Sequence, residues 1–272
     1  MGGDYVLIKD EVYPAPKRLD KLLRVGIFVA MLILSGSLVW LIGISPFMPF
    51  SRIDISGYTG LSREYILISA GITTTSSYFS LNVKAVEKTL SAVPELKSVR
   101  IIKYFPGRLL FILEARQAAA YSLITINGNS VPVFFDSQGI VFQIGTGITM
   151  DARHLPIVSG IAVLDNEMPF LGMQLPAVFR PLFRQIEDIG RTNPELLSAV
   201  SEVRINPKEF DGFDFIMYPV HSKVRVRISE FNENVLKYAL LAVDVLVSEA
   251  PGIKDIDFRS NIASYYPRGG IL

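Results

Sequence analysis

An uncharged segment runs from Val25 to Ser51 and constrains the chain more than any other feature of the sequence. Arg24 and Arg52 bound it, and no other part of the sequence is comparably apolar. About 20 apolar residues in a helix cross the hydrocarbon core of a bilayer. The sequence therefore predicts one transmembrane helix over residues 25–48, followed by a region whose composition is typical of water-soluble domains.

The charges beside this segment predict its orientation. Basic residues in a short loop next to a membrane span remain on the cytoplasmic side. We therefore expect residues 1–24 to form a cytoplasmic tail and the chain from residue 50 onward to be extracytoplasmic. The basic residues before the span are Lys9, Lys17, Arg18, Lys21 and Arg24.

A cleaved secretory signal is the alternative interpretation of the same segment. Its apolar region would be only about 7–15 residues long and would end in small residues. Here the run is longer, and its far end carries the bulky side chains of Phe47, Met48 and Phe50. The sequence therefore favours an uncleaved anchor.

Composition limits what the rest of the chain can be. There is no cysteine, which excludes a small domain held together by disulfides. Residues 50–272 are enough for one large or two modest hydrophobic cores. The chain has 27 basic and 26 acidic residues and a net charge of +1, so nothing indicates a nucleic-acid-binding surface.

The first part of the extracytoplasmic region predicts the element order β-α-α-β-β. Alternating polar and apolar residues predict a strand over 52–56 that ends at Gly57. Ser62 is placed as the N-cap of a helix, and Gly71 ends that helix. A second helix follows Asn82 and stops at Pro94. Strands over 97–104 and 108–114 meet across a turn at 106–107.

The remainder predicts an α+β domain with a mostly antiparallel sheet. A hairpin is expected around Asn127-Gly128-Asn129, with helices over 177–191 and 231–249. The first of these places Val178, Leu182, Ile186 and Ile189 on one face. Strands are expected near 119–127, 131–135, 140–144, 203–205, 213–217, 224–228, 253–259 and 262–266.

Several of these segments resemble a known family. Ile53-Asp54-Ile55-Ser56-Gly57, the hairpin around Tyr104-Phe105-Pro106-Gly107 and the late Asp257-Phe258-Arg259 resemble motifs of the FtsQ/DivIB cell-division family, and the β-α-α-β-β order resembles its POTRA domain. Phe105 departs from the family's frequent tryptophan, and the proline expected after Glu114 is missing. The resemblance implies a POTRA domain over 50–117, an FtsQ-type β domain over 118–266 and a tail over 267–272.

A search for catalytic motifs finds none. The two histidines, His154 and His221, are far apart in the sequence and lack the spacing of metal ligands. A nucleophile elbow and a phosphate-binding glycine loop are also missing. We therefore expect a protein that is not an enzyme and that needs no cofactor or metal.

Binding at a sheet edge is the favoured alternative, because an unpaired edge strand recruits a partner strand. The last predicted strand is the candidate, although its tyrosines are equally consistent with merely covering the sheet. The basic alternation of Lys223, Arg225 and Arg227 is a possible secondary contact, or simply a solvated face. The candidate docking residues are Arg259, Ser260, Asn261, Ile262, Ala263, Ser264, Tyr265 and Tyr266.

The resemblance implies a scaffold of the division machinery in the inner membrane, with its C-terminal region in the periplasm and concentrated at the division site. It also implies partners of the FtsB/DivIC and FtsL types, and an indirect link to the septal peptidoglycan synthase. The alternative function is a POTRA-containing secretion or outer-membrane-assembly component. Such proteins usually carry several POTRA repeats and a β-barrel, whereas this sequence shows one repeat and no barrel alternation.

Overall fold

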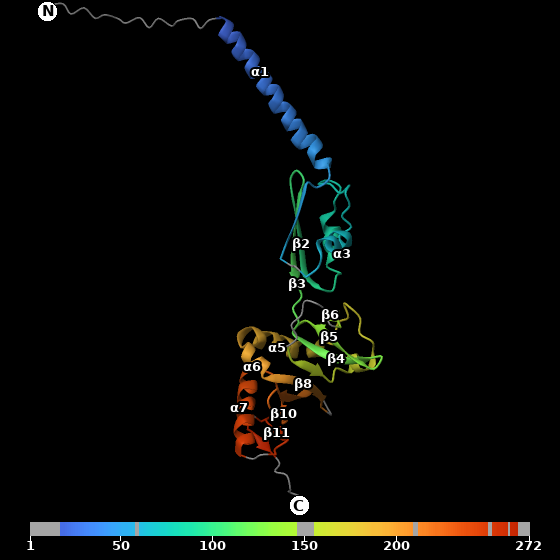
Figure 1. Ribbon diagram of the computed structural model, residues 1–272, viewed down its shortest axis with the longest axis vertical. Coiled ribbons are helices and arrows are strands. Elements are labelled where there is room, and N and C mark those ends of the chain that lie inside the picture. Colours follow the sequence, from blue (N-terminus) through green and yellow to red (C-terminus); the bar gives the residue numbers. More distant parts are fainter. Residues whose placement is uncertain are drawn as a thin grey trace, which may run out of the picture. The chain divides into compact units, whose positions relative to one another are not determined.

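The computed structural model describes residues 17–57, 60–145, 155–208, 212–249, 252–260 and 262–265 (Figure 1). Its elements are those of an α+β protein that follows a long N-terminal helix. The domain boundaries expected at residues 117 and 118 stay a prediction.

The N-terminal helix is longer than the predicted span. Helix α1 covers Lys17–Val39 and continues as a π-turn, Trp40–Ile44, and a 3₁₀ turn, Ser45–Phe47. The charged residues before the apolar segment are also helical. An ion pair between Arg24 and Asp20, at 2.9 Å and one turn apart, supports the helix there. Residues 20–47 are long and apolar enough to cross a membrane, and their side chains are exposed except at Ser45 and Pro46. This segment is a candidate membrane anchor.

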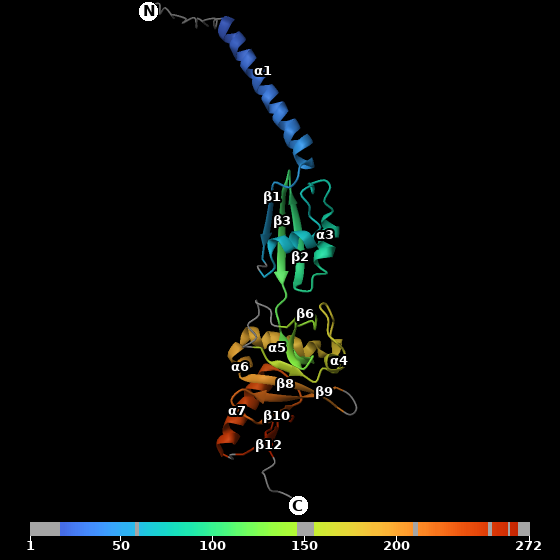
Figure 2. The same ribbon diagram turned by 45° about the vertical axis from the view of Figure 1, so that its right-hand side comes forward.

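The first sheet has the predicted β-α-α-β-β order. Strand β1 covers Arg52–Ser56, helix α2 Arg63–Ser69, helix α3 Val83–Leu90, strand β2 Leu96–Tyr104 and strand β3 Arg108–Ala115. Figure 2 shows β3 between β1 and β2, which agrees with the strand order β1-β3-β2. The polypeptide therefore places its last strand at the centre of this sheet.

Local sequence signals explain both ends of α2. The side chain of Ser62 accepts a hydrogen bond from the Tyr65 amide at 3.1 Å, as an N-cap does. Gly71 follows the helix with φ of +64°, a conformation that favours glycine. Ile66 on α2 and Leu90 on α3 are buried, as is Phe111 on β3. The predicted cap, stop and apolar face are confirmed.

The second sheet has nine strands within the described residues. In order across the sheet they are β12-β11-β10-β9-β8-β7-β4-β5-β6. The pairs β4–β7, β7–β8 and β10–β11 are parallel, and the other neighbouring pairs are antiparallel. The strands are β4 Ala120–Ile126, β5 Asn129–Phe135, β6 Val141–Ile144, β7 Ile157–Ser159, β8 Val200–Pro207, β9 Phe213–Pro219, β10 Arg225–Ile228, β11 Asp255–Asp257 and β12 Ser264–Tyr265.

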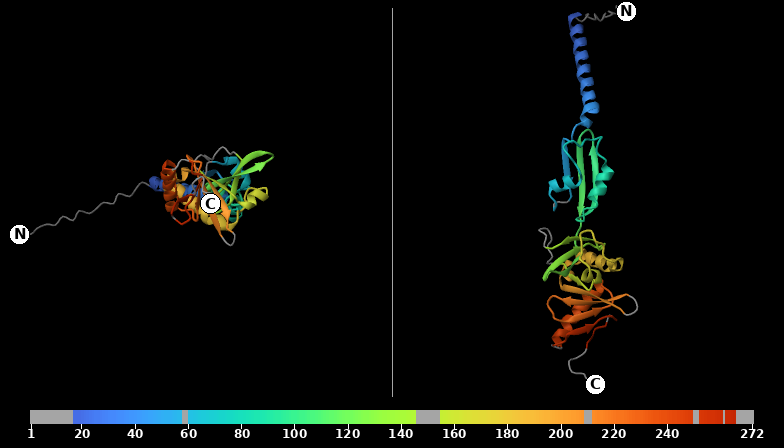
Figure 3. Two further views of the ribbon diagram at one scale, coloured as in Figure 1. Left: turned by 90° about the horizontal axis from the view of Figure 1, so that it is seen from below. Right: turned by 90° about the vertical axis from the view of Figure 1, so that its right-hand side faces the viewer.

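Helices cover one face of this sheet. Figures 1 and 3 show α7, in red, along one side of the late strands. Its inward residues Leu236, Ala239 and Val243 join the same buried cluster as Val226 on β10. The helical elements are α4 Ala162–Asn166, a 3₁₀ turn Ala177–Phe179, α5 Arg180–Thr192, α6 Pro194–Ser198 and α7 Glu233–Glu249.

The prediction that Val178 belongs to the core is wrong. Val178 was placed on the buried face with Leu182, Ile186 and Ile189, but its side chain is exposed whereas the other three are buried. The reason is local: residues 177–179 form a 3₁₀ turn, and the α-helix begins only at Arg180. Because a 3₁₀ turn has about three residues per turn, the helical spacing does not extend back to Val178.

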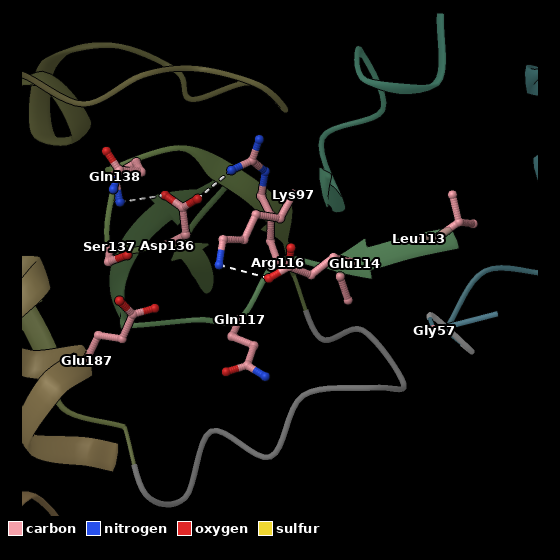
Figure 4. Close-up of a pocket in the computed structure, with 11 residues that line it drawn as sticks. Gly57, Lys97, Leu113, Glu114, Arg116, Gln117, Asp136, Ser137, Gln138 and Glu187 are labelled. Atoms are coloured by element: carbon pink, nitrogen blue, oxygen red, sulfur yellow. Dashed lines mark hydrogen bonds and ion pairs between the residues drawn. The ribbon is translucent and has the colours of Figure 1, made fainter. Parts of the chain in front are cut away.

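A charged pocket of about 520 Å³ lies beside the end of β3 (Figure 4). Arg116 forms an ion pair with Asp136, and both side chains are largely buried. Arg116 Nε also donates to the Pro94 carbonyl at 2.8 Å, and Asp136 accepts from the Gln138 amide at 2.9 Å. Because these two charges satisfy one another, we assign the Arg116–Asp136 pair a stabilising role.

The pair Gly57 and Gly71 gives a matched test of backbone constraint. A Cβ at Gly57, whose φ is +102°, would lie 2.0 Å from the Leu113 carbonyl oxygen, whereas a Cβ at Gly71 meets nothing within 4 Å. Gly71→Ala should lower the free energy of unfolding by about 1 kcal/mol. Gly57→Ala should lower it clearly more, because two backbone segments must separate. Urea unfolding of the full chain in detergent micelles checks this, and equal losses would contradict it.

Removing the buried cation should be costly as well. Arg116→Ala leaves the Asp136 carboxylate buried without its charge partner, and we expect a loss of about 2–4 kcal/mol in the free energy of unfolding. The control is Arg191→Ala, since the Arg191–Asp188 pair is solvent-exposed and should contribute no more than about 0.5 kcal/mol. Similar losses in the two variants would show that the buried pair is not structurally important.

Candidate functional site

The predicted docking segment lies at an edge of the nine-stranded sheet. Strand β12 pairs antiparallel with β11, with Tyr265 opposite Ile256 and Ser264 opposite Asp257. Ser264 Oγ also donates to the Asp257 carbonyl at 3.2 Å. Within the described residues no strand pairs with the other side of β12. An edge without a strand partner is the kind of edge to which a further strand can add.

The opposite edge of the same sheet is covered where β6 begins. There the Val141 amide donates to the Met173 carbonyl at 2.8 Å, and the Gly172 amide donates to the Val141 carbonyl at 2.7 Å. A bridge between Ile140 and Gln174 continues this contact. Because the segment before α5 occupies the edge of β6 in this way, β12 is the edge better suited to a partner.

Arg259 is held by two carboxylates. Its Nη2 lies 2.6 Å from Asp257 Oδ2, and its Nη1 lies 3.2 Å from Asp214 Oδ2. The Arg259 amide also donates to Asp257 Oδ1 at 3.1 Å, and its carbonyl accepts from Ser229 Oγ at 3.1 Å. These contacts fix the backbone at the start of the turn that leads into β12. We call Arg259, Asp257 and Asp214 the arginine clamp.

The clamp shifts the pKa values of Asp257 and Arg259. The hydrogen bond from Arg259 holds the pKa of Asp257 below its ordinary value. The same pairing, together with the hydrogen bond to Asp214, raises the pKa of Arg259. Lys208 Nζ lies 3.1 Å from the other oxygen of the largely buried Asp214 carboxylate. The guanidinium is therefore already engaged, which makes it better suited to positioning than to contacting a partner.

The remaining candidate docking residues differ in how exposed their side chains are. Ile262 is 72% exposed, whereas Ala263 packs against the main core. Ser260 and Ser264 are exposed, and Tyr265 is partly so. Asn261 and Tyr266 lie outside the described residues. Ile262 and Tyr265 are therefore the described apolar side chains that a partner strand would meet here.

The basic alternation lies on the open face of the sheet, next to acidic residues. Lys223, Arg225 and Arg227 are exposed, while Val224 and Val226 between them are buried. Arg225 Nη2 forms an ion pair with Asp255 Oδ2 at 2.7 Å, and this contact raises the pKa of Arg225. In the parallel pairing Arg227 lies opposite Asp257. Acidic neighbours therefore balance most of this stripe, which favours the solvated-face interpretation.

A second apolar surface was missed by the sequence analysis. Helix α7 exposes Tyr238, Leu241 and Val245, which share one outer face at helical spacing. A cavity of about 360 Å³ lies beside this helix. Leu240 and Val247 line it from the helix, and the turn at His221 lines it from the other side. The sequence did carry a signal for this surface, because α7 is apolar on nearly all sides. A helix with one solvated face should instead be polar on that face.

Comparison with known proteins agrees with this architecture. The model of the FtsQ-type POTRA domain matches residues 48–114, which includes the three-stranded sheet. A cell division protein DivIB of Geobacillus kaustophilus is 30% identical over 225 residues, covering 82% of this chain and 78% of that protein.

Two further relatives carry the same kind of name. DivIB of Bacillus cytotoxicus is 23% identical over 226 residues, covering 82% of this chain and 77% of the relative. A cell division protein FtsQ of Geobacter sp. strain M21 is 22% identical over 189 residues, covering 69% and 64%. The anchor helix, the POTRA match and these similarities show that the chain belongs to the FtsQ/DivIB family of cell division proteins.

Proposed function

We propose that this protein is a non-catalytic, single-pass membrane scaffold of the division machinery that binds a partner through the edge of β12. The observation that carries the proposal is that, among the described residues, no strand pairs with the outer side of β12, whereas the other edge of the sheet is contacted by its own chain at Val141. The role in cell division rests on the family to which the chain belongs, and the mode of binding rests on the edge of β12.

The binding mode is β-augmentation. An extended segment of an FtsB/DivIC-type protein adds to β12 as a further strand, so that main-chain hydrogen bonds give affinity. Ile262 and Tyr265 give specificity because their side chains are the apolar groups exposed along this edge. Lys223, which lies on the open face, is a secondary contact for an acidic part of the same partner.

Arg259 acts as a positioning residue in this proposal. The arginine clamp fixes the chain at the start of the turn, so that β12 is held against β11 before a partner arrives. Preorganising an edge in this way reduces the ordering cost of binding.

The wider role follows from the membrane anchor. With its N-terminus in the cytoplasm, the protein presents both sheets on the extracytoplasmic side, the periplasm in a cell with an outer membrane. There it joins an FtsB/DivIC-type and FtsL-type pair at the division site, and through them it recruits or regulates the septal peptidoglycan synthase. The basic residues before the span support this orientation.

A pull-down from solubilised host membranes tests the proposal. The full chain is compared with a chain that ends at Arg259 and therefore lacks β12. We expect FtsB- or FtsL-like coiled-coil proteins to be recovered with the full chain only. Recovery of the same proteins with both baits would remove the docking role of β12. Recovery of outer-membrane barrel proteins or secreted clients instead would favour an assembly role.

A single substitution refines this test. Ile262→Pro removes a backbone N–H and fixes φ in the bend two residues before β12, so we expect loss of partner binding with little change in stability, since Ile262 is exposed. Ile262→Ser is the matched control because it changes the side chain but keeps the N–H. Normal binding by the proline variant would contradict strand addition, and equal loss in both variants would point to the side chain alone.

The clamp predicts a pH dependence. Because the pKa of Asp257 is lowered by Arg259, its stabilising effect is complete above the unfolded-state pKa of about 3.9 and is lost as pH falls through the lower folded-state value. The difference in unfolding free energy between the wild type and Asp257→Asn should therefore shrink below about pH 4. Urea unfolding at a series of pH values measures it. In an Arg259→Ala background this pH dependence should largely disappear, and its persistence would contradict the clamp.

A further inference from the structure

Exposed aromatic side chains gather where the candidate membrane span ends. Phe47, the last residue of the span, is 68% exposed, Phe79 is 58% exposed and Phe105 is 47% exposed. The ring centroids of Phe47 and Phe79 lie 5.0 Å apart, and those of Tyr78 and Phe105 lie 5.7 Å apart. We call Phe47, Tyr78, Phe79, Tyr104 and Phe105 the aromatic cluster.

Backbone hydrogen bonds tie this cluster to the end of the span. The Phe50 amide donates to the Ser76 carbonyl at 3.2 Å, and the Ser51 amide donates to the Gly107 carbonyl at 2.9 Å. Ser51 is only four positions after Phe47, so the chain between them reaches at most about 14 Å. The loops that carry Phe79 and Phe105 therefore stay near the membrane surface at any helix tilt.

The cations near the cluster are already engaged. Lys103 Nζ donates to the Tyr78 and Leu81 carbonyls at 2.7 and 3.1 Å. Arg108 pairs with Asp54 at 2.8 Å, and its guanidinium lies 5.5 Å from the centre of the Tyr104 ring. The surface that remains to be covered is therefore aromatic rather than basic.

We propose that the aromatic cluster contacts lipid in the interfacial layer of the bilayer that the anchor crosses. Tyrosine concentrates at this depth because its apolar ring carries a polar hydroxyl, and phenylalanine is common on the apolar face of interfacial segments. An exposed apolar patch of this kind marks an interaction site. The contact would steady the three-stranded sheet at the membrane surface. It depends on the anchor but not on partner binding at β12, so either idea can fail without the other.

Fluorescence quenching in bilayers tests the contact. Trp40 is the only tryptophan and lies within the span, so its quenching by deeply brominated phosphatidylcholine confirms that the full chain has inserted. Phe105→Trp in a Trp40→Phe background then places the single tryptophan in the aromatic cluster, so that its fluorescence reports the surroundings of the cluster. We expect blue-shifted emission and stronger quenching by lipid brominated near the headgroup than by lipid brominated deep in the chain. Phe79→Trp makes the same measurement if the turn at residue 105 does not tolerate tryptophan.

The control is Tyr238→Trp in the same background, because Tyr238 is 57% exposed on α7 and gives the background for an exposed aromatic side chain. We expect quenching at the cluster to exceed this background severalfold, equally in neutral bilayers and in bilayers containing phosphatidylglycerol. Quenching at background level would overturn the proposal. Quenching that requires anionic lipid would show that charged rather than aromatic side chains make the contact. An emission shift that appears only after host membrane proteins are added would assign the aromatic cluster to a protein partner.

Discussion

A β-sheet that does not close must leave its outermost backbone groups unpaired, and this constraint governs the C-terminal half of the molecule. At the edge of β6 the chain supplies its own cover, since the segment before α5 exchanges hydrogen bonds with Val141. At β12 the outer side has no partner strand within the described residues. Two residues of pairing with β11 hold a strand only weakly, so the arginine clamp becomes important.

The clamp links three parts of the sheet region. Asp214 comes from β9, Asp257 from β11, and Arg259 from the turn between β11 and β12. The exposed members of such a cluster are screened by solvent and contribute little to global stability. Their effect is geometric, because they set where the chain leaves β11 and how β12 returns to it. The proposed docking at this edge therefore depends on a local ionic contact rather than on the large hydrophobic core.

The sequence predicted most of the fold because local signals were strong. Ser62 and Gly71 marked the ends of α2, and Asn127 and Gly128, both with positive φ, made the hairpin turn. It missed β7, since three residues, Ile157–Ser159, are too few to show an alternating pattern. It also placed Val178 in the core, because the helical spacing gave no sign that a 3₁₀ turn precedes Arg180.

The edge position of the last strand was predictable, but the contacts of the candidate residues were not. That the last strand forms an edge followed from its place in the chain, and the structure confirms it for the residues described. The engagement of Arg259 by Asp214 was not predictable, because those residues are 45 positions apart and meet only through the sheet. The pairing of Arg225 with Asp255 likewise depends on a parallel register that sequence spacing does not give.

Amide hydrogen exchange of the full chain, with and without an FtsB/DivIC-type partner, tests the central claim most directly. The account predicts that the partner slows exchange in β12, at Ser264 and Tyr265, while the covered strand β6 is unchanged. Unchanged exchange in β12 in the presence of bound partner, with new protection elsewhere, would contradict docking at this edge.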